Sequence, residues 1–125
     1  MMTNIYRNPE NSYSYRSVEV PANSRMLFIS GQTATDKNGI TPSDPDIQAD
    51  IVYKKIIDSL EQAGMSKEDL VKTNVYITDP KYTSSVYKAG QKYNPNSKQA
   101  GTLVYVKALA SPEVFIEIEA IAAKK

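Results

Sequence analysis

The chain has 125 residues, of which 15 are basic and 14 acidic, and its net charge is +1. A chain of this size builds one compact core, so we expect a single domain over residues 1–125. The nearly balanced charge lacks the basic stripe that phosphate binding requires, which argues against a nucleic-acid partner. Cysteine and histidine are both absent, which excludes disulfides, Ser-His and Cys-His catalysis and ordinary zinc sites.

The N-terminal residues, 1–12, are polar and are predicted to form a loose arm. They carry Arg7 without an apolar segment behind it, which does not support a secretory signal. No apolar run in the chain approaches the ~20 residues that a membrane-spanning helix needs. We therefore expect a cytoplasmic protein with no membrane partner.

Alternation of side chains predicts a first strand at Tyr13–Val20, and a turn follows at residues 21–24. The next segment, Met26–Gly31, is predicted to pair back on this strand as a hairpin. A second turn comes after it, and Ile40 is expected to begin a short third strand.

The segment Met26–Ile29 contains four large apolar residues in succession, which predicts a strand buried on both faces. It ends abruptly at Ser30 and Gly31. Gly31 has no side chain, so a ligand can approach its backbone closely, and Ser30 offers a hydroxyl beside it. This pair suits the mouth of a ligand pocket. The alternative is a plain core strand that ends in a turn.

A first helix is predicted over Pro45–Ala63. Asp44 can accept hydrogen bonds from the first free amides, and a proline at the first helical position loses none. Apolar residues then recur at helical spacing until Gly64 ends the run.

A β-rich segment at Lys72–Thr78 predicts the next strand. Asp79-Pro80 repeats the helix-start pattern, so a second helix is expected from there to residues 94–97. Two further strands are predicted at Gly101–Leu109 and Val114–Ala122.

This order of elements predicts an α+β fold, with one mixed sheet and two helices that cover one of its faces. The last strand divides its side chains between the faces. The set expected to pack under the helices is Val114, Ile116, Ile118 and Ala120. The set expected on the open face is Phe115, Glu117, Glu119 and Ile121. This open face mixes apolar and polar groups, so it is a candidate oligomer surface.

Four segments resemble the RidA or YjgF-like proteins, the family of reactive intermediate deaminases. The resemblance rests on the order and spacing of Leu27–Gln32, Leu60–Gly64, Val71–Asp79 and Ile116–Ala122. It implies a chorismate-mutase-like fold that assembles as a homotrimer around a central barrel of sheets. It also implies that a small-molecule ligand binds between subunits.

Active members of this family hydrolyse enamines and imines to 2-keto acids and ammonia, and they need no metal or other cofactor. The resemblance implies an arginine that binds the substrate carboxylate bidentately. Counting back from Leu109 places Gly101 at that position. We therefore predict a small-molecule-binding homotrimer without the family's usual imine deaminase activity. Whether the protein is an enzyme stays open, and the alternative is a 2-iminobutanoate/2-iminopropanoate deaminase.

Other positions also differ from the family pattern. Tyr87 stands where the resemblance places an asparagine, and Leu103 replaces a small residue two places after Gly101. An early tyrosine is represented by Tyr15 or Tyr13. Because these side chains are bulky and aromatic, we expect a less anionic and more aromatic ligand.

Ser30, Gly31 and Glu117 match the family pattern. By resemblance, Glu117 is the catalytic carboxylate that positions or activates water. The predicted ligand-binding residues are Tyr15, Ser30, Gly31, Tyr87, Gly101, Thr102 and Leu103.

Lys98 and Arg16 are the candidate replacements for the missing cation. Lys98 lies three residues before Gly101, and Arg16 lies on the first predicted strand. Neither occupies the matching position, and solvated surface charges are the alternative. A ribonuclease, as some relatives are described, finds little support in a neutral chain without histidine, and a purely structural or chaperone-like trimer is the remaining alternative.

Overall fold

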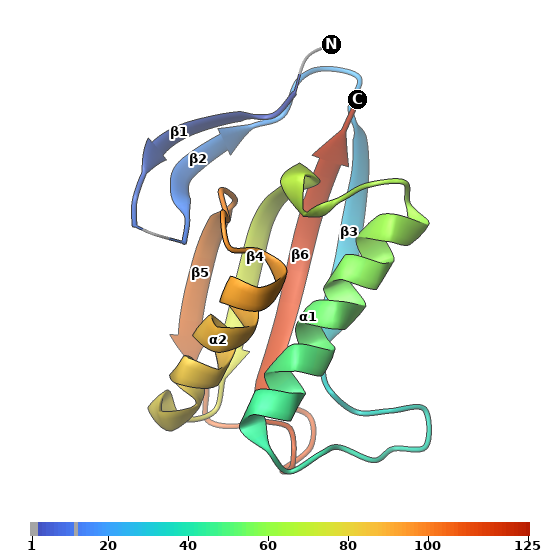
Figure 1. Ribbon diagram of the computed structural model, residues 1–125, viewed down its shortest axis with the longest axis vertical. Coiled ribbons are helices and arrows are strands. Elements are labelled where there is room, and N and C mark those ends of the chain that lie inside the picture. The colour runs from blue at the N-terminus through green and yellow to red at the C-terminus, as the bar shows by residue number, and fades with distance from the viewer. Residues whose placement is uncertain (1–2, 12) are drawn as a thin grey trace.

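Two helices lie against one face of a four-stranded sheet in the computed structural model, which describes residues 3–11 and 13–125 (Figure 1). The strands of this sheet, in spatial order, are β3 (Arg25–Gln32), β6 (Ile116–Lys124), β4 (Leu70–Ile77) and β5 (Ala100–Tyr105). The helices are α1 (Pro45–Gln62) and α2 (Thr83–Tyr93), and short 3-10 turns at Lys67–Asp69 and Pro80–Tyr82 precede β4 and α2. Because β4 and β5 run parallel while the other pairs are antiparallel, the sheet is mixed, and the predicted α+β architecture is confirmed.

The N-terminal segment is not the loose arm that was predicted. Residues Ile5–Pro9 form β1, which pairs antiparallel with β2 (Tyr15–Glu19) as a separate two-stranded sheet. The Tyr6 hydroxyl donates to the carbonyl oxygens of Glu68 and Leu70, at 3.0 and 3.1 Å, which attaches this hairpin to the start of β4. The parts of the predicted arm at residues 1–2 and 12 lie outside the described residues.

The predicted hairpin between the second and third strands is also wrong. β3 pairs with β6 instead, in a register that sets Leu27 opposite Ala122 and Ile29 opposite Ala120. Large side chains thus face small ones across the pair, and both sets join the core under α1. β3 therefore pairs with β6, from the far end of the chain, and not with β2, its neighbour in sequence.

No strand begins at Ile40. The Asp36 carboxylate accepts hydrogen bonds from the amides of Asn38 and Ile40, both at 2.9 Å, and Gly39 has a φ of +80°. These contacts form a closed turn that satisfies the amides locally, so no neighbouring strand is required.

α1 begins and ends where its sequence predicts, within one residue. The Asp44 carboxylate accepts from the amide of Asp46 at 2.8 Å, and Gly64 ends the helix with a φ of +70°. Val52, Ile56 and Leu60 form its buried stripe and are at most 3% exposed. Within the described part of the chain, no helix has both the length and the apolar composition needed to cross a bilayer.

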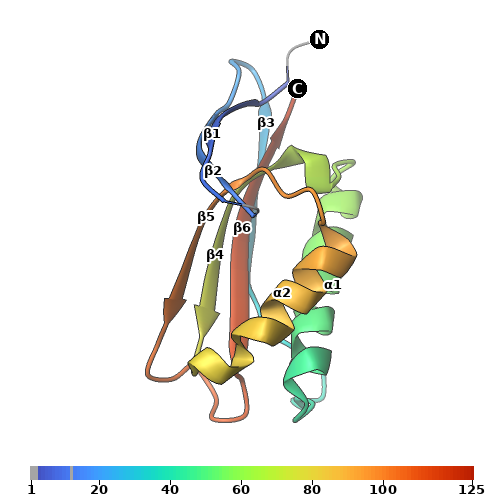
Figure 2. The same cartoon turned by 60° about the vertical axis from the view of Figure 1, so that its left-hand side comes forward.

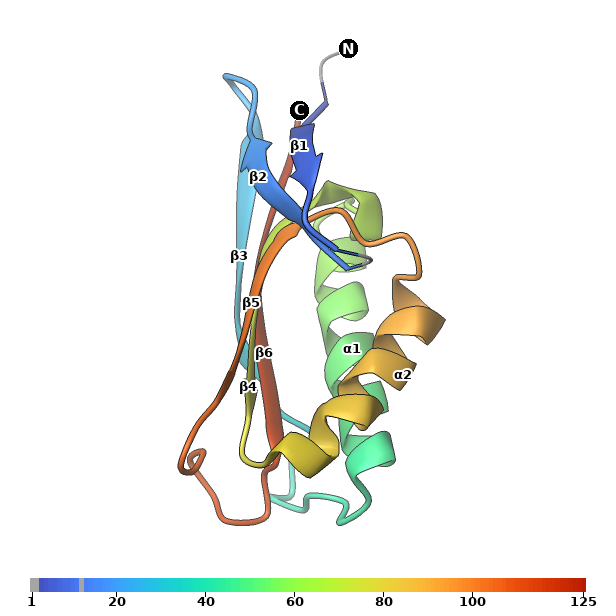
Figure 3. The ribbon, with the colours of Figure 1, turned by 90° about the vertical axis from the view of Figure 1, so that its left-hand side faces the viewer.

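Both helices lie on the same side of the four-stranded sheet (Figures 2 and 3). The opposite face carries exposed apolar side chains. Phe28 is 71% exposed and Met26 is 46% exposed, while the alternate residue Ile29 is buried. The expectation that β3 is buried on both faces is therefore wrong for one chain. Phe115 was placed on this open face, but it precedes β6 and stacks on Tyr82 against the core.

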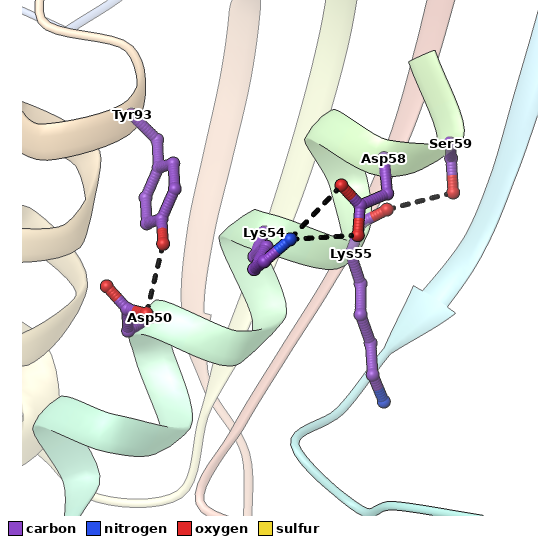
Figure 4. A network of polar contacts seen from close by, with 6 residues as sticks. All are labelled: Asp50, Lys54, Lys55, Asp58, Ser59 and Tyr93. Atoms are coloured by element: carbon purple, nitrogen blue, oxygen red, sulfur yellow. Dashed lines mark hydrogen bonds and ion pairs between the residues drawn. The ribbon is translucent and has the colours of Figure 1, made fainter. Parts of the chain in front are cut away.

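Polar contacts connect α2 to α1. The Asp50 carboxylate accepts from Lys92 Nζ at 2.7 Å. It also accepts from the Tyr93 hydroxyl at 3.0 Å (Figure 4). The hydrogen bond from Lys92 lowers the pKa of the Asp50 carboxyl. One turn earlier, the Asp46 carboxylate accepts from Lys88 Nζ at 2.6 Å. These pairs join the exposed sides of the two helices, while Val52 of α1 and Val86 and Ala89 of α2 share one buried cluster. α2 also carries Tyr87.

Gln48 is a fully buried amide of α1 that connects the loop before this helix to the loop before β6. Its Nε2 donates to the carbonyl oxygens of Pro42 and Glu113, both at 2.8 Å, and its Oε1 accepts from the amide of Phe115 at 3.0 Å. All three partners are backbone groups without another described side-chain partner, so the amide satisfies them in place of water.

We expect Gln48→Ala to lower the free energy of unfolding by about 2–4 kcal/mol, because it leaves these backbone groups unpaired. Urea unfolding at one protein concentration measures this change. Gln62→Ala, at an exposed position near the end of the same helix, is the control and should change stability by less than ~0.5 kcal/mol. Equal effects of the two variants would contradict the structural role of Gln48.

Candidate functional site

A cavity of about 170 Å³ lies between α2 and the β4–β5 edge of the sheet. Tyr13 and Ser14, from the connection between β1 and β2, line one side, and Ser97 lines it from the loop between α2 and β5. Tyr53 reaches the cavity from α1. Figure 1 shows the β1–β2 hairpin beside α2 and β5, so segments distant in sequence meet here.

Four of the predicted ligand-binding residues line this cavity together: Tyr87, Gly101, Thr102 and Leu103. Thr73 of β4 stands opposite Gly101 of β5 in the parallel pair, and α2 is the crossover that connects the two strands. A crossover helix lies over the strands that it joins, so one face of α2 is held above Gly101.

Of the two tyrosines near the N-terminus that were candidates for the site, Tyr13 is the one that lines the cavity. Its ring stacks on Tyr87 with centroids 4.7 Å apart and planes 3° apart, and the two rings are 41% and 42% exposed. Tyr15 instead meets Tyr6 edge to face at 5.9 Å and does not line the cavity. The Ser97 hydroxyl donates to the Tyr13 carbonyl oxygen at 2.7 Å, which ties the tyrosine to the neighbouring loop.

Ser30, Gly31 and Glu117 form a second group, away from the cavity. Gly31 lies against Glu117, since a Cβ at residue 31 would overlap Oε2 and lie 2.9 Å from Cδ of that side chain. β3 and β5 are the two outer strands of the sheet. Three strand spacings separate them, or roughly 14 Å, so one chain does not unite Ser30 with Gly101.

Neither proposed replacement cation reaches Gly101. The Arg16 guanidinium donates to the Glu10 carboxylate at 3.0 and 3.1 Å, and Lys98 Nζ lies 5.9 Å from the centroid of the Tyr6 ring. Among the described residues, the cavity lining includes no lysine, arginine, aspartate or glutamate. Within the described part of the chain, neither candidate cation therefore lies at Gly101.

Uncharged polar groups line the cavity instead. Gln99 Nε2 lies 3.4 Å from Thr73 Oγ1, and Gln99 Oε1 accepts from Asn94 Nδ2 at 3.3 Å. The Tyr53 hydroxyl lies beside Gly90, where a Cβ would be 3.3 Å from Oη. Burial raises the pKa of Tyr53 to about 12, so at neutral pH this hydroxyl keeps its proton and can donate. The arrangement can hydrogen-bond a neutral ligand.

Sequence patterns did not indicate four residues of the cavity wall, which are Tyr53, Thr73, Gly90 and Gln99. Gly90 carried a usable signal, because a glycine inside a helix costs about 1 kcal/mol relative to alanine and so suggests a close approach. It lies one turn after Tyr87, on the face that lines the cavity. The other three gave no local signal.

The family model described as Endoribonuclease L-PSP matches residues 5–124. The chain belongs to this family, which comprises the RidA/YjgF-like proteins. A RutC family protein of Pyrococcus horikoshii is 39% identical over 102 residues, which are 80% of each chain. This Rid-family protein also resembles solved structures. One is a Rid-family protein of unknown function from Yersinia pestis, with a TM-score of 0.81, 30% identity, and coverage of 97% of this chain and 98% of that one.

A second solved relative is RidA from an Antarctic Psychrobacter, with a TM-score of 0.71 and 27% identity, where the match covers 94% of this chain and 92% of that one. The matches extend over nearly the whole of both chains. The Rid fold of this protein is therefore shown, including the strands that carry both groups of site residues.

Gly31→Ala is expected to lower the free energy of unfolding by about 1–3 kcal/mol, because the added Cβ overlaps the Glu117 carboxylate. Adding Glu117→Ala should remove most of that loss, since it deletes the group with which the methyl collides. Urea unfolding of the two single variants and the double variant, at one protein concentration, gives the coupling. Additive effects would show that Gly31 and Glu117 do not constrain each other.

Proposed function

We propose that this protein is a homotrimer that binds a small, uncharged metabolite in clefts between subunits and lacks imine deaminase activity. The observation that carries the proposal is the cavity at Gly101, whose described lining has no charged side chain. A carboxylate that entered would lose its hydration without gaining a guanidinium, and an unpaired buried charge is strongly unfavourable.

The division of the site supports the trimer. Ser30, Gly31 and Glu117 lie toward one edge of the sheet and Gly101 at the other, so a neighbouring subunit is needed to bring the groups together. The exposed face also offers apolar area for association, from Phe28 and Met26. Symmetric assembly of three chains around this face would cover Phe28 and Met26 and would bring the two groups of site residues together.

Light scattering at micromolar concentration should return about three times the 13.9 kDa mass of one chain. Phe28→Lys places a charge on the exposed face and should lower the measured mass. Asn38→Lys, which adds the same charge in the exposed turn after β3, is the matched charge control and should leave the trimer intact. A monomeric mass for the unmodified protein would overturn the trimer.

The second candidate is an imine deaminase. Its support is the group of Ser30, Gly31 and Glu117, which keeps a carboxylate next to a small-residue edge. Against it stand Gly101 and the stacked Tyr13 and Tyr87, which occupy space beside the position where a small substrate would bind.

Hydrolysis of 2-aminoacrylate-type imines should be at least ~100-fold slower than with an arginine-bearing relative, since bidentate carboxylate binding is lost. A coupled assay for 2-keto acid release measures this. Turnover equal to that of the relative would refute the proposal and favour the second candidate.

Gly101→Arg tests whether the site lacks only its cation. Gly101 does not have the positive φ that would oppose the substitution, and a Cβ there meets Thr73 Oγ1 at 3.4 Å, an ordinary contact. We expect a folded trimer with measurable affinity for small 2-keto acids but little deamination, because Tyr87 and Leu103 still fill the site. Robust imine hydrolysis by this single variant would mean that the cleft has not been rebuilt.

A further inference from the structure

The cavity at Gly101 presents three tyrosine rings and one leucine side chain to a ligand. Tyr13 and Tyr87 stand at the mouth, and Tyr53 and Leu103 line the interior. Aromatic faces favour a planar ring, which stacks on them at little entropic cost. A ligand here therefore has an aromatic body.

The size of the cavity restricts that body. An apolar cavity of about 150 Å³ accommodates benzene, whereas sites for drug-sized ligands begin near 300 Å³. The 170 Å³ that one chain provides here accommodates one six-membered ring with a small substituent.

The Tyr53 hydroxyl identifies the substituent. It faces the cavity beside Gly90 and, among the described residues, makes no hydrogen bond of its own. Thr73 and Gln99 add neutral donors and acceptors on the strand side. A neutral group with both a donor and an acceptor, such as a carboxamide, satisfies them, while a carboxylate finds no cation.

We infer that the site selects uncharged single-ring aromatic compounds with a carboxamide-like substituent, the ring against Tyr87 and the substituent on the Tyr53 hydroxyl. This inference rests on the proposed function and names the ligand class of the same site. Gly90 is a specificity determinant in this arrangement, because any side chain there would enter the space beside the hydroxyl.

The first test compares benzamide with benzoate, which share size and shape and differ in charge. Calorimetric titration of the full-length protein should show benzamide binding at least ~10-fold more tightly, since the anion loses hydration without a partner. Equal affinity for the two probes, or no binding of benzamide, overturns the inference.

The second test removes single groups. Tyr53→Phe should weaken benzamide binding by roughly 3–10-fold, the range expected for one neutral hydrogen bond. Tyr105→Phe is the matched control, because its hydroxyl bonds to Thr83 at 2.7 Å and does not line the cavity, so binding should not change. Identical benzamide affinity in Tyr53→Phe and the unmodified protein overturns the role of the hydroxyl.

Gly90→Ala provides a variant that does not depend on loss of a tyrosine. The added methyl narrows the cavity beside Oη, so benzamide binding should fall by at least ~10-fold, and the melting temperature checks that the variant stays folded. Unchanged binding in this variant contradicts the location of the site.

The coupled deaminase assay separates a failure of the proposed function from a failure of the ligand class. A protein that is inactive on imines and does not bind benzamide keeps the proposed function and loses the ligand class. A protein that hydrolyses imines as fast as an arginine-bearing relative loses both.

Discussion

The burial of β6 between two other strands and under α1 is the constraint on which the rest of the structure depends. Ile116 and Ile118 are at most 2% exposed, and they meet α1 at residues such as Val52, which is fully buried. Full burial of such side chains contributes about 1.5–3 kcal/mol each. Because β6 takes the centre beside β4, β3 and β5 become the edges, and the two groups of site residues are held apart.

That separation gives the assembly a chemical role in the proposal. Within one chain, Gly31 and Glu117 form one close contact, and Gly101 faces Thr73 in another place. A copy of the chain that covers the exposed face would bring complementary groups together and would bury Phe28 at the same time. The same contact would stabilise the oligomer and complete the site.

The changes around Gly101 are consistent with one another. The side chain that would bring a positive charge is absent, the described lining is neutral, and two parallel tyrosine rings stand over it. A neutral aromatic ligand gains from each of these features, whereas a small anion gains from none. Under the proposal the site is rebuilt rather than damaged, and Asp50 connects α1 to the helix that carries Tyr87 through Lys92 and Tyr93.

Elements with strong local signals were predicted from sequence. α1 is an example, since Asp44 caps it and Gly64 ends it through contacts within a few residues. The assignment of the arginine position to Gly101 rests on counting along one strand and stays a prediction. By contrast, the residues of the cavity wall come from four helices and strands and the two connections beside them, and Tyr53 carries no local mark of its role.

Local patterns were enough to predict the helices, the central strands and the family, because periodicity, capping residues and motif spacing are local properties. The pairing of β3 with β6, the strand at Ile5–Pro9 and the stacking of Tyr13 on Tyr87 became known from the folded chain alone. These outcomes depend on competition between distant segments for the same apolar surface and the same backbone hydrogen bonds. Pattern within one segment does not reveal which competitor wins.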